Sequence, residues 1–118
     1  MSNRKRELGF VFFKLESDKE PVRDWLTSLQ DEEKKKIGRA IRRAQKEWPL
    51  GMPVVRAMGD GLFEIRVAFE NTIARILFMT HDSVIVALHG FIKKSNTTPK
   101  ADLDLAKERA KKVRSGNH

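Results

Sequence analysis

The chain has 118 residues, the size of one domain, and its hydrophobic content of 40% suits a folded core rather than a disordered segment. It contains no cysteine, which excludes a disulfide framework, a thiolate nucleophile and cysteine-bound zinc or iron–sulfur clusters. Lysine and arginine outnumber acidic residues by 24 to 16, so the formal net charge is +8. A domain this basic usually meets nucleic acid, the ribosome or a membrane surface, although the excess charge can also serve solubility alone.

The apolar stretches at 10–13 and 84–88 fall far short of the roughly 20 residues that a membrane helix needs. The basic start of the chain is suggestive of a signal peptide, but Lys14 ends the apolar run and no small-residue cleavage site follows. We therefore expect a soluble, cytoplasmic protein that makes no use of a membrane.

The first half of the chain predicts one strand followed by a helical hairpin. Residues 8–15 are rich in Phe and Val and indicate a strand, which a turn at 17–19 ends. A helix is expected to begin at Pro21, because the apolar residues at 22, 25, 26 and 29 follow one helical stripe. A second, basic helix is expected to have Asp31 as its N-cap and to end at the prolines of the 48–53 segment. Val22, Trp25 and Trp48 are predicted core residues.

The second half changes to the period of two that is typical of strands. Strands are expected at 62–69, 72–80 and 84–90, joined by short turns into an antiparallel meander, and a last helix is expected from Pro99 to Val113. The predicted fold is a single α+β domain over 1–118, in the order β-α-α-β-β-β-α, with frayed ends at 1–7 and 114–118. The helical hairpin should cover one face of the sheet, and the other face is expected to be more polar and to carry the chemistry.

The short turn at 70–71 allows the pairing of the first two meander strands to be predicted. If Phe69 lies opposite Thr72, Arg66 lies directly opposite Arg75, and apolar pairs fall on the other face. Two adjacent guanidinium groups repel each other unless an anion, or a carboxylate such as Glu64, bridges them. Because the guanidinium fork suits phosphate oxygens, the pair is a candidate anion site, although two unrelated surface arginines would give the same pattern.

Further candidates follow the last strand. Lys93 and Lys94 would add positive charge near the arginines, although a solvated pair would look the same. His89 is a candidate general acid or base. A three-residue turn at 81–83 would place it beside Arg75, whereas a two-residue turn would place it in the core. The three histidines lack the spacing of metal ligands, so no metal site is predicted.

Several short motifs, in their order and spacing, make the chain similar to a known family over about residues 8–112. They are Phe13-Lys14, the 20–26 segment Glu-Pro-Val-Arg-Asp-Trp-Leu, the 48–53 segment Trp-Pro-Leu-Gly-Met-Pro, the 62–66 segment Leu-Phe-Glu-Ile-Arg, the 74–78 segment Ala-Arg-Ile-Leu-Phe, and the 88–94 segment Leu-His-Gly-Phe-Ile-Lys-Lys followed by Thr98-Pro99. The chain resembles the RelE/HigB superfamily of toxins from type II toxin–antitoxin pairs, in particular its phage-derived HigB-like branch.

The resemblance implies a ribosome-dependent mRNA endonuclease (an mRNA interferase) in which the ribose 2′-OH attacks the adjacent phosphate without a metal or cofactor. It implies that the catalytic side chains are Arg66, Arg75, His89, Lys93 and Lys94. Many relatives use a catalytic Tyr near the end of the chain, and this chain has no Tyr. Proton transfer would then fall to His89, to a lysine or to ribosomal RNA. The expected RNA-binding residues, several of them in the basic segment 107–118, are Arg56, Lys100, Lys107, Lys111 and Lys112.

The resemblance also implies partners: the ribosome, mRNA, and a helix-turn-helix (HigA-like) antitoxin that forms a heterotetramer with the toxin. Two other functions fit the same sequence. One is a non-catalytic, ParE-like inhibitor of DNA gyrase, and the other is a basic RNA-binding module without toxicity.

Overall fold

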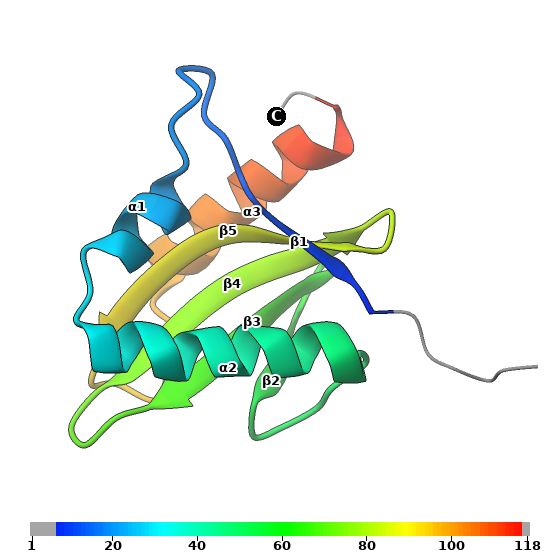
Figure 1. Ribbon diagram of the computed structural model, residues 1–118. Coiled ribbons are helices and arrows are strands. Elements are labelled where there is room, and N and C mark those ends of the chain that lie inside the picture. The colour runs from blue at the N-terminus through cyan, green and yellow to red at the C-terminus, as the bar shows by residue number, and fades with distance from the viewer. Residues whose placement is uncertain (1–6, 117–118) are drawn as a thin grey trace, which may run out of the picture.

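The computed structural model describes residues 7–116 and shows a five-stranded mixed sheet with helices on both faces (Figure 1). In chain order the elements are β1 (Gly9–Phe12), α1 (Pro21–Thr27), α2 (Asp31–Glu47), β2 (Val55–Gly59), β3 (Leu62–Ala68), β4 (Ile73–His81), β5 (Val84–Lys93) and α3 (Lys100–Arg114). The strand order across the sheet is β1-β5-β4-β3-β2. The predicted α+β class, the helical hairpin, the meander and the last helix are confirmed.

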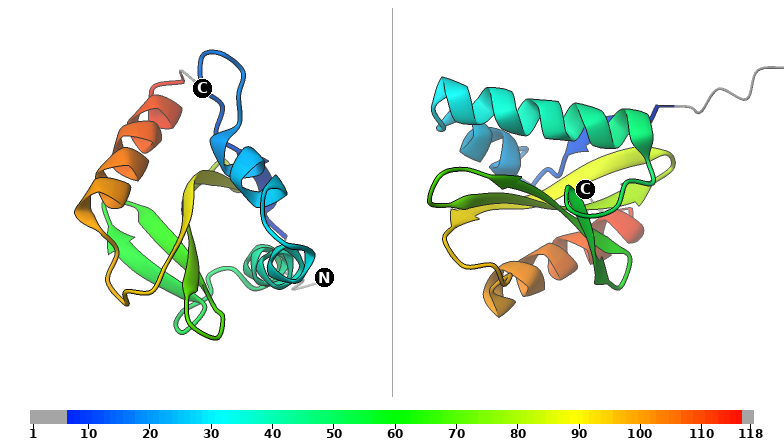
Figure 2. Two further views of the ribbon diagram at one scale, coloured as in Figure 1. Left: turned by 90° about the vertical axis from the view of Figure 1, so that its left-hand side faces the viewer. Right: turned by 90° about the horizontal axis from the view of Figure 1, so that it is seen from below.

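The helices α1 and α2 cover one face of the sheet, as predicted (Figure 2). Val22 is fully buried there, and Trp25 and Trp48 pack against the same apolar cluster, so all three belong to the core. The cap of α2 differs from the prediction by one residue. The helix begins at Asp31, and the capping residue before it is Gln30, whose backbone N–H donates to the Glu33 carboxylate at 3.0 Å.

The opposite face was expected to be the polar one, and this expectation is wrong for most of its area. The helix α3 lies across that face (Figure 2) and buries Ala106, Ala110 and Val113 against a second apolar cluster that includes Phe13 and Leu77. Small alanine side chains let α3 approach the sheet closely, so a narrow stripe of apolar residues is enough to pack the helix against this face. The buried polar side chains of this face lie near the beginning of α3.

Two strand pairings depart from the predicted order. Residues 55–59 form β2, a strand that was not among those predicted from the sequence. It lies between a proline-containing segment and a glycine turn and leaves most of its side chains exposed at the sheet edge. The N-terminal strand β1 pairs with β5 in parallel, with Gly9 opposite Val84 and Phe12 opposite Ala87. The sheet is therefore mixed rather than wholly antiparallel.

The frayed ends predicted at 1–7 and 114–118 lie largely outside the described residues. Of those that are described, Glu7 forms an ion pair with Arg42 at 2.9 Å, and Arg114 ends α3 and donates to the Asp60 carbonyl at 2.7 Å. Within residues 7–116, no helix combines the length and apolar character that a membrane crossing requires.

Candidate functional site: an arginine pair beside a histidine–aspartate contact

The predicted strand register is confirmed. Arg66 of β3 lies opposite Arg75 of β4, and Arg75 lies opposite Phe91 of β5, so these side chains form one row across the sheet. A second row, on the same face, runs from Arg56 of β2 through Glu64 and Leu77 to His89, with which Leu77 is paired. Because alternate residues of a strand share a face, both rows lie on the α3 side.

Glu64 lies between the two arginines and is the carboxylate that bridges them. Its Oε1 atom is 3.9 Å from Arg66 Nε and 3.9 Å from Arg75 Nε. The side chains of Glu64 and Arg75 are both 0% exposed, whereas Arg66 keeps 16% of its surface. Burial lowers the pKa of the Arg75 guanidinium, and the Glu64 carboxylate opposes that effect. Arginine nevertheless stays charged at neutral pH, so one negative and two positive charges meet here.

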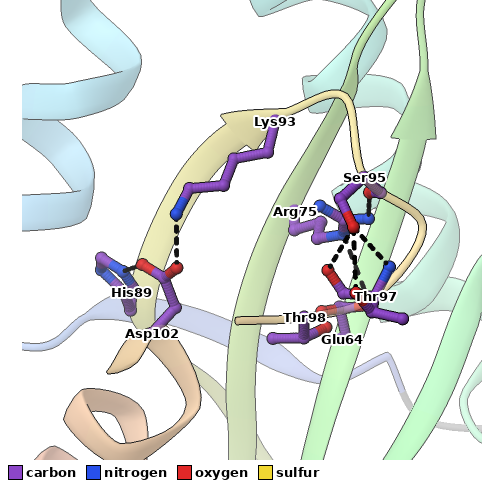
Figure 3. Close-up of polar contacts among 8 residues, drawn as sticks. All are labelled: Glu64, Arg75, His89, Lys93, Ser95, Thr97, Thr98 and Asp102. Atoms are coloured by element: carbon purple, nitrogen blue, oxygen red, sulfur yellow. Dashed lines mark hydrogen bonds and ion pairs between the residues drawn. The ribbon is translucent and has the colours of Figure 1, made fainter. Parts of the chain in front are cut away.

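The segment 94–99, which we call the strap, crosses this group between β5 and α3 (Figure 3). Arg75 Nη2 donates to the Ser95 carbonyl, Arg66 Nη2 donates to the Asn96 carbonyl at 3.1 Å, and the Thr98 hydroxyl donates to Glu64 Oε2. Among residues 7–116, three buried side-chain atoms form no hydrogen bond, and all belong to this group: Glu64 Oε1, Arg75 Nε and Arg75 Nη1. The strap thus covers the arginine pair without fully satisfying it.

A β-bulge decides the position of His89. The turn between β4 and β5 has two residues, since His81 pairs with Val84, and this alone would point His89 into the core. However, Phe78 pairs with Ala87 while Leu77 pairs with His89, so Leu88 is an extra residue in β5. The bulge returns His89 to the α3 face, the face of Arg75. The two turn lengths considered from the sequence therefore both miss the actual arrangement.

His89 and Lys93 are joined by Asp102 in the first turn of α3 (Figure 3). His89 Nε2 is 2.7 Å from Asp102 Oδ1, and Lys93 Nζ is 3.0 Å from Asp102 Oδ2. Burial by itself would raise the pKa of Asp102, but hydrogen bonds from His89 and Lys93 outweigh burial and hold that pKa below its ordinary value. An ionised carboxylate only accepts hydrogen bonds, so His89 carries a proton on Nε2. The other ring nitrogen, Nδ1, is left for other partners.

Phe91 supports both groups of polar residues. Its ring stacks on the His89 ring with centroids 5.3 Å apart, and the Arg75 guanidinium carbon and Lys93 Nζ lie 5.7 Å and 5.6 Å from its centroid. A buried aromatic ring fixes the positions of cations and of an imidazole by contact with its face. The candidate residues Arg66, Arg75, His89 and Lys93 therefore belong to one assembly, whereas Lys94 is exposed at the start of the strap.

The predicted RNA-binding residues spread over the surface around this assembly. Arg56 is exposed on β2, in the row of Glu64. Along α3, Lys100 pairs with Asp104 at 2.9 Å, Lys107 pairs with Asp60 at 3.4 Å, and Lys111 and Lys112 are exposed. A cleft lined by Asp60, Leu62, Lys107, Lys111 and Arg114 separates the end of α3 from the β2–β3 turn.

Sequence reasoning missed Asp102, Phe91 and the strap residues Ser95 and Thr98. An acidic residue in the first turn of a helix is usually explained by the helix dipole, so Asp102 gave no separate signal. The roles of Phe91 and the strap depend on tertiary contacts, which the sequence pattern does not predict. Among the described residues, no three His, Cys, Asp or Glu side chains are grouped closely enough to hold a metal ion.

Comparison with known proteins places most of the site within a known family model. Residues 24–111 match a family model described as "Phage derived protein Gp49-like". No curated protein matches the chain. The matched range contains every residue of the arginine pair, the strap and the histidine–aspartate contact.

Proposed function

Because the chain belongs to the phage-derived Gp49-like family, in general a RelE/HigB-like toxin family, we propose that it is the toxin of a toxin–antitoxin pair and cleaves mRNA on translating ribosomes. The pairing of Arg66 with Arg75 is the observation that carries this proposal. Each guanidinium presents a planar fork of donors that suits phosphate oxygens. Glu64 balances only one of the two charges, so the group keeps a net positive charge that favours an anion.

The proposed reaction needs no metal. The 2′-oxygen of a ribose forms a bond to the adjacent phosphorus, and the bond from phosphorus to the 5′-oxygen of the next nucleotide breaks. The products are a 2′,3′-cyclic phosphate and a 5′-hydroxyl. Negative charge grows on the non-bridging phosphate oxygens in the transition state, and donors fixed toward those oxygens lower the barrier. We assign this role to Arg66 and Arg75.

Two proton transfers accompany the reaction, because the 2′-OH loses a proton and the leaving 5′-oxygen gains one. His89 is the side chain that we assign to proton transfer at Nδ1, with Asp102 holding the ring through Nε2. Lys93, whose ammonium group shares Asp102, adds positive charge beside His89, and the exposed Lys94 adds another at the start of the strap. The second transfer falls to a lysine or to ribosomal RNA, since the chain has no tyrosine.

Ribosome binding is assigned to the cations around the site. Arg56, Lys100, Lys107, Lys111 and Lys112 would contact RNA phosphates, an interaction that needs no base recognition and weakens with salt. The proposed inhibitor is a small helix-turn-helix antitoxin that forms a heterotetramer with the toxin. The place of action would be the cytoplasm, where translating ribosomes are found.

Pulse labelling after induction of the chain tests the proposal. We expect incorporation of labelled amino acids to stop before incorporation of labelled thymidine, and Arg66→Gln to abolish the arrest. Arg39→Gln, which removes an exposed charge from α2, should arrest growth like the parent chain. Thymidine incorporation that stops first would support a gyrase inhibitor instead. Unimpaired growth with a soluble, folded chain would support a non-toxic RNA-binding module.

A further inference from the structure

The strap, residues 94–99, separates Arg75 from any RNA, because Arg75 has no exposed surface beneath it. We propose that the strap is a gate, closed in this structure, that a phosphodiester displaces when it binds the arginine pair. The inference rests on the proposed function and adds regulation to the same site. It explains how a phosphate-binding arginine can be fully buried in a protein without substrate.

The strap contributes backbone carbonyls at the positions that phosphate oxygens would take. The Ser95 carbonyl accepts from Arg75, and the Asn96 carbonyl accepts from Arg66 at 3.1 Å. A carbonyl oxygen is uncharged, whereas the non-bridging oxygens of a phosphodiester share a full negative charge and form stronger hydrogen bonds with guanidinium groups. Replacing the two carbonyls by one phosphate therefore strengthens both interactions.

Hydrogen bonding within the closed arrangement is also incomplete. Arg75 Nε and Nη1 and Glu64 Oε1 are buried without hydrogen bonds. The 3.9 Å ion pair between Arg75 Nε and Glu64 Oε1 does not replace the hydrogen bonds to water that these atoms lose on burial. A phosphate that enters beside Arg75 offers acceptors to the two nitrogen atoms. The unsatisfied donors of a fully buried arginine are thus the observation that points to an exchangeable cover rather than a permanent one.

The strap is held by few interactions. Its residues 94–97 are exposed and include no apolar side chain, so moving them costs no buried apolar surface. Ser95 Oγ and Thr97 Oγ1 are 2.9 Å apart, a hydrogen bond that can move with the segment. The one side-chain hydrogen bond from the strap to the buried group, among the described residues, is that of the Thr98 hydroxyl to Glu64. Segments with so few buried contacts open locally at a small fraction of the free energy that unfolds the whole protein.

The two ends of the strap are fixed more firmly than its middle. Asp102 of α3 binds Lys93 and His89 of β5, at 3.0 Å and 2.7 Å. The strap can therefore move while α3 stays in place. Opening would uncover Arg75 and leave His89 where the proposed proton transfer needs it.

Thr98→Val and Thr98→Ser form the matched pair of variants that tests the gate. Valine has the shape of threonine but no donor for Glu64, whereas serine keeps the hydroxyl. Phenylglyoxal, which reacts with accessible guanidinium groups, is applied to the full chain, and each modified arginine is located by mass spectrometry. Arg39, exposed on α2, and Arg109, half-buried on α3, serve as internal references.

We expect Arg75 to react at least about tenfold more slowly than Arg39 in the parent chain, and roughly tenfold faster in Thr98→Val than in the parent. Thr98→Ser should behave like the parent, and Arg109 should react equally in all three proteins. Titration with inorganic phosphate, followed by the NMR signals of arginine Nε–H groups, should show tighter binding to Thr98→Val. Equal Arg75 reactivity and equal phosphate affinity in the valine and serine variants would overturn the gate.

If Thr98→Val does not fold, Thr97→Gly replaces it, because this change loosens the strap and leaves the Thr98 hydroxyl in place. Cleavage of ribosome-bound mRNA separates the gate from the proposed function. If the loosened variant exposes Arg75 but neither it nor the parent cleaves mRNA, the gate stands and the proposed function fails. If the parent cleaves mRNA while Arg75 reactivity does not respond to the strap variants, the proposed function stands and the gate fails.

Discussion

Arg75 and Glu64 are buried together, both without exposed surface, and Arg75 Nε lies 3.9 Å from Glu64 Oε1. Arg66 Nε lies at the same distance from this oxygen, so Glu64 is the one carboxylate beside two guanidinium groups. Removing it leaves the buried charge of Arg75 without compensation, which costs about 3–5 kcal/mol. Glu64→Gln, which preserves side-chain volume, should therefore lower the free energy of unfolding by about that amount. Urea unfolding followed by tryptophan fluorescence measures it.

The matched double variant is Glu64→Gln/Arg75→Met. It removes both charges and keeps an acceptor for the Thr98 hydroxyl, so it should recover most of the stability that Glu64→Gln loses. A double variant no more stable than Glu64→Gln would show that the loss comes from packing rather than from an unpaired guanidinium group. Toxicity should be absent in the double variant, since it lacks a phosphate-binding arginine.

Gly90 is required by its close approach to Trp25. A β-carbon at position 90 would lie 2.4 Å from two carbons of the Trp25 ring, on the face opposite His89. Gly90→Ala should therefore destabilise the protein by about 1–3 kcal/mol. Gly38 in α2 has open space around its β-carbon position, and Gly38→Ala should stabilise by up to about 1 kcal/mol. Equal midpoints of thermal unfolding for the two variants would refute this explanation of the packing between α1 and β5.

The pKa of Asp102 gives a pH dependence with a definite sign. Because hydrogen bonds hold the folded-state pKa below its ordinary value of 3.8, the carboxylate contributes stability that is fully present above that value and is lost as pH falls through the folded pKa. The difference in unfolding free energy between the parent chain and Asp102→Asn should be constant near neutrality and should shrink below about pH 4. A difference that stays constant down to about pH 2 would contradict the prediction.

The exposed end of α3 should contribute to ribosome binding through charge alone. Each lysine that no longer neutralises a phosphate reduces the slope of log affinity against log salt by about 0.7–0.9, so Lys111→Gln/Lys112→Gln should reduce it by roughly 1.5. Lys35→Gln/Arg39→Gln removes the same charge from α2 and should leave the slope unchanged. Filter binding of the labelled proteins to ribosomes at several salt concentrations gives the slopes. Identical slopes for the three proteins would show that Lys111 and Lys112 face solvent only.

Local patterns were sufficient to predict most of the fold. The two-residue turn at 70–71 fixes the register of β3 and β4, so the opposition of Arg66 and Arg75 could be predicted without tertiary information. The stripe in α1 identified Trp25 as core in the same way. Edge strand β2 was not predicted because its exposed and buried residues do not alternate. The parallel pairing of β1 with β5 was not predicted because it joins segments more than 70 residues apart.

The site was less predictable because its interactions are long-range or irregular. A bulge at Leu88 reverses the face on which His89 lies, and no sequence signal marks it. Asp102 meets His89 only because α3 packs across the sheet. The strap's use of backbone carbonyls at Ser95 and Asn96 leaves no trace in side-chain chemistry, so the burial of Arg75 could not be anticipated.

The chemical nature of the RNA ends produced on translating ribosomes tests most directly whether the arginine pair is the phosphate site of an mRNA endonuclease. Purified chain is added to ribosomes that carry a labelled mRNA, and the products are mapped and their termini are determined. We predict cleavage that leaves a 2′,3′-cyclic phosphate and a 5′-hydroxyl, with Arg66→Gln slower by roughly 100-fold or more and Arg39→Gln equal to the parent chain. Intact mRNA with the folded parent chain, or equal cleavage by Arg66→Gln, would contradict the assignment of the arginine pair as the phosphate site of an mRNA endonuclease.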